Sequence, residues 1–176
     1  KANFDDHVLV YYAGHGVVDR ASDVAYWIPS DAGRDFAPDW VSAGELQNAF
    51  KTIQARHLLL VADSCYSGKL LRGDTTVASG SSESMVKRLF EKKARVAMTS
   101  GGEEPVVDSV AGSEHSVFAE ALIKGLGQNN GPLPASALYG RVLTEVSSEA
   151  SQTPQYADMR ELGHDGGDFI FVPINW

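Results

Sequence analysis

The sequence predicts an α/β fold, with a mostly parallel sheet flanked by helices. Two continuous apolar runs of strand length, residues 8–13 and residues 58–62 of an expected strand at 57–62, are typical of parallel strands that are buried on both faces. Segments with helical periodicity separate these and later strands along the chain. Strands that alternate with helices favour a parallel sheet with helices on both of its faces.

The other elements follow from periodicity and from signals at their ends. A strand at 24–28 stops before Pro29. Ser42, with Glu45 three residues later, forms a capping-box pattern that predicts a helix from there to about residue 53. Further helices are expected at 85–93, 116–126 (with Gly127 as its C-cap) and 134–149, further strands at 94–100 and 169–172, and loops at 30–40, 68–84 and 152–167.

Length and charge restrict the class of protein. The 176 residues fit one domain, 1–176, and the net charge of −8 argues against nucleic acid or an anionic membrane as a partner. One cysteine cannot form an internal disulfide, which favours a reducing compartment. No apolar run reaches the roughly 18–20 residues that span a bilayer. These features predict a cytoplasmic protein that binds neither nucleic acid nor membranes.

The start of the chain is abrupt. Only residues 1–7 precede the first apolar run, so a core strand begins almost at once. A natural N-terminus rarely leads so directly into a core strand. We therefore expect this domain to be a piece of a longer protein.

A histidine and the single cysteine follow the two apolar runs. His15 lies between Gly14 and Gly16, and Cys65 lies in a turn of small residues. The carboxyl ends of parallel strands share one edge of the sheet, where active sites of α/β folds are built. A nearby base can make a thiol nucleophilic, and the backbone N–H groups of Gly16 and Cys65 are candidate oxyanion donors.

Non-catalytic roles for His15 and Cys65 are the alternative to a catalytic pair. A lone cysteine after a strand is usually an inert core residue, and a lone histidine is usually structural. The occurrence of both at strand ends favours catalysis. No zinc-site spacing or phosphate-binding loop is present, and the remaining histidines are interpreted as structural: His7, His57, His115 and His164.

The two motifs resemble those of a known family. Residues 11–16 (YYAGHG) and 63–68 (DSCYSG) look like the His and Cys motifs of caspase-like peptidases. The separation of 50 residues between His15 and Cys65 is also similar to that in caspases. The resemblance is greater to the metacaspase, paracaspase and bacterial orthocaspase branches, because animal caspases have Gln-Ala-Cys where this chain has Asp-Ser-Cys. Residues 99–101 and 166–173 also resemble later parts of prokaryotic members.

This resemblance implies a caspase–haemoglobinase fold with His15 and Cys65 as the catalytic dyad and Gly16 in the oxyanion hole. It also implies that a strand, a helix and a second strand precede the His-bearing strand. This chain lacks them, which agrees with the expectation of a longer protein.

Asp63 is the candidate for substrate specificity. The arginine- and lysine-specific branches of the family carry an acidic residue two positions before the cysteine, and here that residue is Asp63. Its carboxylate would pair with a basic P1 side chain, preferably the forked guanidinium of arginine. Ala13, at the end of the His-bearing strand, is assigned with it to substrate binding. The alternative is that Asp63 only caps the turn.

Two further questions concern activation. Lys69 and Arg72 follow the cysteine in a long polar loop and are candidate self-cleavage sites, or simply solvated charges. Calcium-activated relatives carry acidic residues where Ala43, Gly44 and Arg72 stand here, although Asp31 matches one such position. This difference argues against calcium dependence, and neither a metal nor another cofactor is expected.

The sequence thus leads to one main hypothesis and two rivals. The main hypothesis is a cysteine endopeptidase that cleaves protein or peptide substrates after Arg or Lys, regulated by self-cleavage, by a further domain or by an activator protein. One rival is a catalytically silent caspase-fold scaffold. The other is a hydrolase that uses Ser64 or Ser67, although neither serine lies in a Gly-x-Ser-x-Gly elbow.

Overall fold

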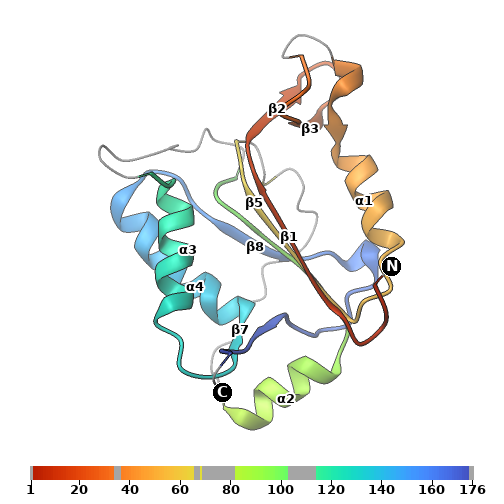
Figure 1. Ribbon diagram of the computed structural model, residues 1–176. Helices are drawn as coiled ribbons and strands as arrows, with labels where there is room; N and C mark the ends of the chain where they lie inside the picture. The colour runs from red at the N-terminus through yellow and green to blue at the C-terminus, as the bar shows by residue number, and fades with distance from the viewer. Residues whose placement is uncertain (1, 34–36, 66–67, 69–81, 103–113, 175–176) are drawn as a thin grey trace.

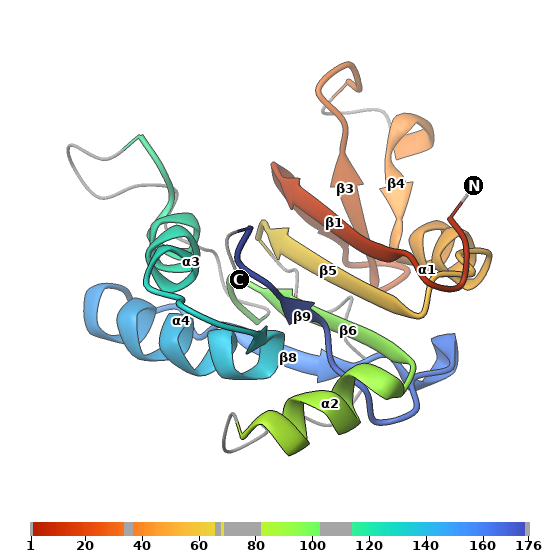
Figure 2. The ribbon, with the colours of Figure 1, turned by 60° about the horizontal axis from the view of Figure 1, so that its bottom comes forward.

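The computed structural model describes residues 2–33, 37–65, 68, 82–102 and 114–174. Its main sheet contains, in spatial order, β1 (His7–Ala13), β5 (His57–Asp63), β6 (Ala94–Thr99) and β8 (Gln155–Asp158). The first three strands are parallel and β8 is antiparallel. Helices cover both faces (Figures 1 and 2), so the predicted fold class is confirmed.

The helices divide between the two faces and one end of the sheet. Helix α1 (Ala43–Lys51) lies on one face, and α3 (Val117–Gly127) and α4 (Ala135–Glu149) lie on the other (Figure 1). Helix α2 (Glu83–Glu91) lies near the end of the sheet where β1 and β5 begin. No helix in the described part of the chain is long and apolar enough to cross a membrane.

Shorter elements complete the fold. Strands β2 (His15–Asp19), β3 (Val24–Ile28) and β4 (Val41–Ser42) form a small antiparallel sheet that extends beyond the end of β1 (Figure 1). Two-residue strands β7 (Leu133–Pro134) and β9 (Ile170–Phe171) pair with each other, and 3-10 turns occupy Ala37–Asp39 and Arg160–Leu162.

Two hydrophobic clusters fill the space on either side of the sheet. Successive strand residues point to opposite faces. In β5, Leu59 and Val61 therefore join the cluster with α3 and α4, whereas Leu58 and Leu60 join the cluster with α1. Every residue of β5 is buried, as the apolar run predicted.

Strand β1 differs from its prediction. It forms an edge of the main sheet, and β5 is its partner within the described part of the chain. Its residues alternate between exposed and half-buried, and Leu9 and Tyr11 are 50% and 47% exposed. The prediction of burial on both faces was therefore wrong, because an apolar run does not distinguish an edge strand from a central one.

Other differences concern short polar elements. Strand β8 lies inside the predicted loop 152–167, and β2 begins at His15, which we expected in a turn. Neither strand carries a long apolar run. Gly127 is the last residue of α3, and the C-cap is Gln128. The predicted capping box of Ser42 and Glu45 is present, with Glu45 N–H donating to Ser42 Oγ at 3.2 Å.

Arg95 organises the chain where β5 and β6 begin. Its side chain is buried, and its guanidinium donates to the backbone carbonyls of Ile53, Ala55, Arg56 and Ala94 at 2.6–3.1 Å. These bonds satisfy carbonyl groups of the connection between α1 and β5. Both terminal nitrogens of this buried cation are matched by acceptors, which makes its burial tolerable, whereas its Nε has no partner in the described part of the chain.

A histidine pair lies at the same end of the sheet. His7 and His57 are register partners on β1 and β5, and their Nδ1 atoms are 2.9 Å apart. Because His57 Nε2 must donate to the carbonyl of Lys92, its Nδ1 accepts from His7. Burial, and next the neighbouring His7, lower the pKa of His57 to about 4. If His57 were also protonated on Nδ1, this proton would point at the Nδ1 proton that His7 donates, and the two would repel each other.

Acidification should therefore destabilise the fold through His57. The unfolded chain binds this proton near pH 6.5 and the folded chain near pH 4, so the stabilisation is complete above pH 6.5 and is lost as the pH falls. At about 1.4 kcal/mol per pKa unit, the loss is at most about 3.5 kcal/mol. Denaturant unfolding between about pH 4.5 and 7.5 should give a flatter pH dependence for His57→Phe than for wild type. Equal slopes would contradict this assignment.

Candidate active site

The register of β1 and β5 places the histidine and the cysteine at one edge of the sheet. Partners in this register are 50 residues apart, from His7 opposite His57 to Ala13 opposite Asp63. His15 and Cys65 have the same separation, and each follows its strand's last residue by two positions. The strand pairing thus continues into a contact between the loops, where Gly14 N–H donates to the carbonyl of Asp63 at 3.3 Å.

Gly16 lies directly against the cysteine. A Cβ atom at this position would overlap the carbonyl oxygen of Cys65 and lie 3.4 Å from Ser64 Oγ. Only glycine allows the two backbones to approach so closely. Cys65 itself is half-buried and is not in a disulfide. The backbones of the two predicted oxyanion donors are therefore neighbours.

A similar contact holds the turn after the cysteine. Gly68 N–H donates to the carbonyl of Gly102 at 3.0 Å, and a Cβ on Gly68 would be 2.7 Å from Gly102 Cα. Gly102 follows β6, so the turns after β5 and β6 are joined at the same edge of the sheet.

Tyr12 supports the start of β2, where His15 lies. Its single hydroxyl proton is shared between the carbonyl oxygens of His15, at 2.9 Å, and Ile28, at 3.2 Å. Its ring stacks on Trp27 with 3.9 Å between ring centroids. Since Trp27 belongs to the cluster beneath α1, the position of His15 is coupled to the core.

His15 lines two cavities in the part of the chain that the structure describes. One, of about 310 Å³, has Asp63 and the residues before α3 in its wall, and the other, of about 420 Å³, is formed largely by the end of β3 and the loop after it. Tyr11 lines the first cavity and Tyr12 the second, so they lie on opposite faces of β1. The first is lined by Tyr11, Ala13, Gly14, His15, Asp63, Glu114, His115, Ser116 and Ala119.

Asp63 is almost buried at the base of the first cavity. It is 9% exposed, and Ser116 Oγ donates to its Oδ2 at 2.5 Å. Burial, and next the charge of Asp63, raise the pKa of the Tyr11 phenol, which places this carboxylate within electrostatic reach of the ring. A cavity with a buried carboxylate and an aromatic wall suits a cationic side chain.

Comparison with known families agrees with this geometry. A family model described as the caspase domain matches residues 1–161. The chain belongs to the caspase-domain family. It is therefore a member of a family of cysteine peptidases, which act on protein substrates. No curated protein matches the chain.

Within this caspase domain, the structure brings most of the predicted site residues together. Ala13, His15 and Asp63 line one cavity, and Gly16 contacts Cys65. Lys69 and Arg72, the candidate self-cleavage sites, lie outside the described residues, as does Ser67. Ser64 is 2% exposed, and its Oγ has no hydrogen-bond partner in the described part of the chain, so nothing there would activate it as a nucleophile.

Sequence reasoning missed the cavity wall formed by the start of α3. Glu114, His115 and Ser116 line this wall, although we had interpreted His115 as structural. The helix itself was predicted from its periodicity, but only the fold shows that its first turn meets Asp63. In the described part of the chain, no group of three or more His, Cys, Asp or Glu residues could hold a metal ion.

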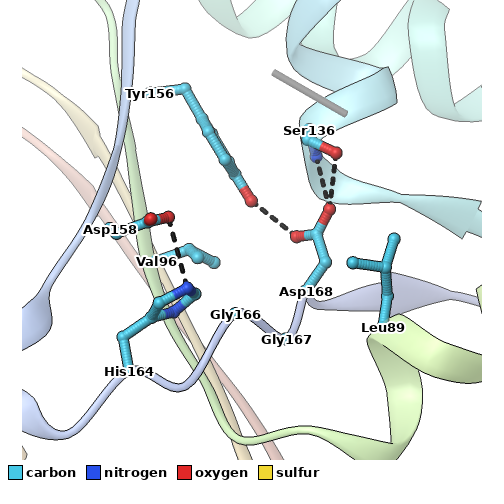
Figure 3. Close-up of a pocket in the computed structure, with 9 residues that line it drawn as sticks. All are labelled: Leu89, Val96, Ser136, Tyr156, Asp158, His164, Gly166, Gly167 and Asp168. Atoms are coloured by element: carbon cyan, nitrogen blue, oxygen red, sulfur yellow. Dashed lines mark hydrogen bonds and ion pairs between the residues drawn. The ribbon is translucent and has the colours of Figure 1, made fainter. Parts of the chain in front are cut away.

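A third cavity, of about 90 Å³, is structural (Figure 3). Its polar centre is Asp168, which is 3% exposed and accepts hydrogen bonds from Tyr156 OH at 2.5 Å, Phe169 N at 2.7 Å, and Ser136 N and Oγ at 3.0 and 2.6 Å. Four donors on one carboxylate anchor the last strand to α4 and β8. Figure 3 shows His164 directed instead toward Asp158, with 3.5 Å between Nε2 and Oδ1.

Replacing Gly16 by alanine should separate the two motif loops. The added methyl group meets backbone, which cannot rotate away, so we expect a large loss of peptidase activity. Gly140→Ala is the matched control, since a Cβ there meets nothing within 4 Å and lies within α4. The control should keep activity and gain up to about 1 kcal/mol of stability. Thermal unfolding and turnover of both variants measure the difference, and an active Gly16→Ala protein would refute the close contact.

Proposed function

We propose that this caspase domain is a cysteine endopeptidase that uses a Cys65–His15 dyad and cleaves after arginine or lysine. The observation that carries the proposal is the β1–β5 register, which delivers His15, Cys65 and Asp63 to one edge of the sheet. The cavity shared by His15 and Asp63 supports the assignment of a basic P1 side chain.

The proposed reaction follows from the roles of these groups. The thiolate of Cys65 attacks the scissile carbonyl, and backbone N–H groups of Gly16 and Cys65 stabilise the oxyanion. His15 gives a proton to the leaving amine as the C–N bond breaks. Water, with His15 as general base, then hydrolyses the thioester and restores the thiol. The coupling of the His15 carbonyl to Tyr12 would keep the imidazole beside the nucleophile.

Charge accounts for the proposed specificity. A nearly buried carboxylate pairs more strongly with a cation than an exposed one, because the local dielectric is lower. Arginine can form a forked pair with it, and its guanidinium can also stack on the exposed Tyr11 ring. Ala13, with its small side chain, leaves room in the same wall.

Activation belongs to the same proposal. Self-cleavage after Lys69 or Arg72, a further domain or an activator protein would regulate the enzyme, without dependence on calcium or another cofactor. The acidic net charge fits a protein that handles basic peptide segments in the cytoplasm.

Short fluorogenic peptides that differ only at P1 (Arg, Lys, Asp and Ala) test the function. Wild type should cleave the Arg and Lys peptides, and Cys65→Ala should lower kcat by about three orders of magnitude or more. Asp63→Asn should lower kcat/KM for the Arg peptide by about 10- to 100-fold, because a charge-assisted pair becomes a neutral one. The Ala peptide should be affected little.

The other outcomes separate the alternatives. Preference for the Asp peptide would keep the nucleophile and refute the basic pocket. If none of the peptides is cleaved and a peptidyl electrophile does not label Cys65, the protein is better described as a catalytically silent scaffold.

A further inference from the structure

The hydroxyl of Ser116 makes two hydrogen bonds whose directions are fixed. It donates to Asp63 Oδ2 at 2.5 Å and accepts from the N–H of Ala119 at 2.9 Å. The second bond makes Ser116 the N-cap of α3. Because a hydroxyl has one proton, and the carboxylate oxygen only accepts, this rotor has one orientation.

Ser116 is held firmly in place by the helix that it caps. Val117 and Phe118, the next two residues, are 2% and 0% exposed in the cluster between the sheet and α3. The helix therefore cannot shift without disturbing the core. From this fixed position, Ser116 contacts the carboxylate of Asp63, which is 53 residues away in the sequence.

We infer that Ser116 is a positioning residue for P1 recognition, which holds the Asp63 carboxylate in the orientation that receives the P1 cation. This inference rests on the proposed function, and it names a residue that acts through Asp63 on the preference for arginine over lysine. The hydroxyl and the carboxylate both line the cavity beside His15, so the bond lies in the wall that the P1 side chain would meet.

Arginine and lysine side chains depend differently on the orientation of a carboxylate. A forked guanidinium pairs with a carboxylate in one plane, so it depends on the carboxylate's orientation. A lysine ammonium is a point charge with rotatable donors, so it tolerates a carboxylate that turns. Loss of the Ser116 bond should therefore harm arginine recognition more than lysine recognition. Glu114, in the same wall, adds negative charge that attracts both basic side chains alike, so it does not create this difference.

The test compares three variants on the P1 peptide panel. Ser116→Ala should lower kcat/KM for the Arg peptide about tenfold, for the Lys peptide about two- to threefold, and for the Ala peptide hardly at all. Ser116→Thr keeps the hydroxyl and should restore the Arg-to-Lys ratio. Ser42→Ala removes a serine N-cap of the same kind from α1, so it should lower the melting temperature by a few degrees without changing the ratio.

Two results would overturn the inference. An equal loss for all peptides in Ser116→Ala would mean that the residue only caps α3, and an unchanged Arg-to-Lys ratio would mean that Asp63 keeps its orientation without it. In either case the proposed function survives if Asp63→Asn still lowers cleavage of the Arg peptide. If Asp63→Asn leaves that cleavage unchanged, the basic pocket itself is refuted. In the Asp63→Asn background, Ser116→Ala should have no further effect on the Arg-to-Lys ratio.

Discussion

The parallel pairing of β1 with β5 is the constraint on which the rest of the structure depends. The register of this pair aligns the last residues of the two strands, Ala13 and Asp63, side by side. The segments that follow the two strands then meet at Gly16, which lies so close to the backbone of Cys65 that a Cβ atom would not fit between them. A shift of one residue would invert every side chain of one strand and also separate the histidine from the cysteine. Folding and the assembly of the site are therefore the same event.

Much of this arrangement could be predicted from the sequence because its signals are local. The apolar run of β5, the capping box at Ser42 and the periodicity of α3 and α4 each depend on neighbouring residues. The two motifs could be recognised for the same reason. Their spacing of 50 residues has a physical meaning that only the structure supplies, since it equals the offset of the strand pairing.

The features that could not be predicted depend on contacts distant in sequence. Strand β8 is short and polar, and it becomes a strand because β6 offers it a partner. The exposure of β1 follows from its place at the edge of the sheet, which an apolar run does not reveal. Ser116 carries an ordinary N-cap signal, and nothing in its sequence surroundings indicates that the same hydroxyl reaches Asp63.

The two ends of the main sheet carry different kinds of side chain. Arg95 and the His7–His57 pair gather buried polar contacts where the parallel strands begin, whereas the thiol lies where they end. The candidate active site and the buried polar contacts of Arg95 and His57 therefore lie at opposite ends of the same strands. Cys65→Ala removes one half-buried sulfur atom and leaves the wall around Asp63 untouched. If Cys65 is the nucleophile, as proposed, such a protein should bind its natural substrates without cleaving them and so retain them for identification.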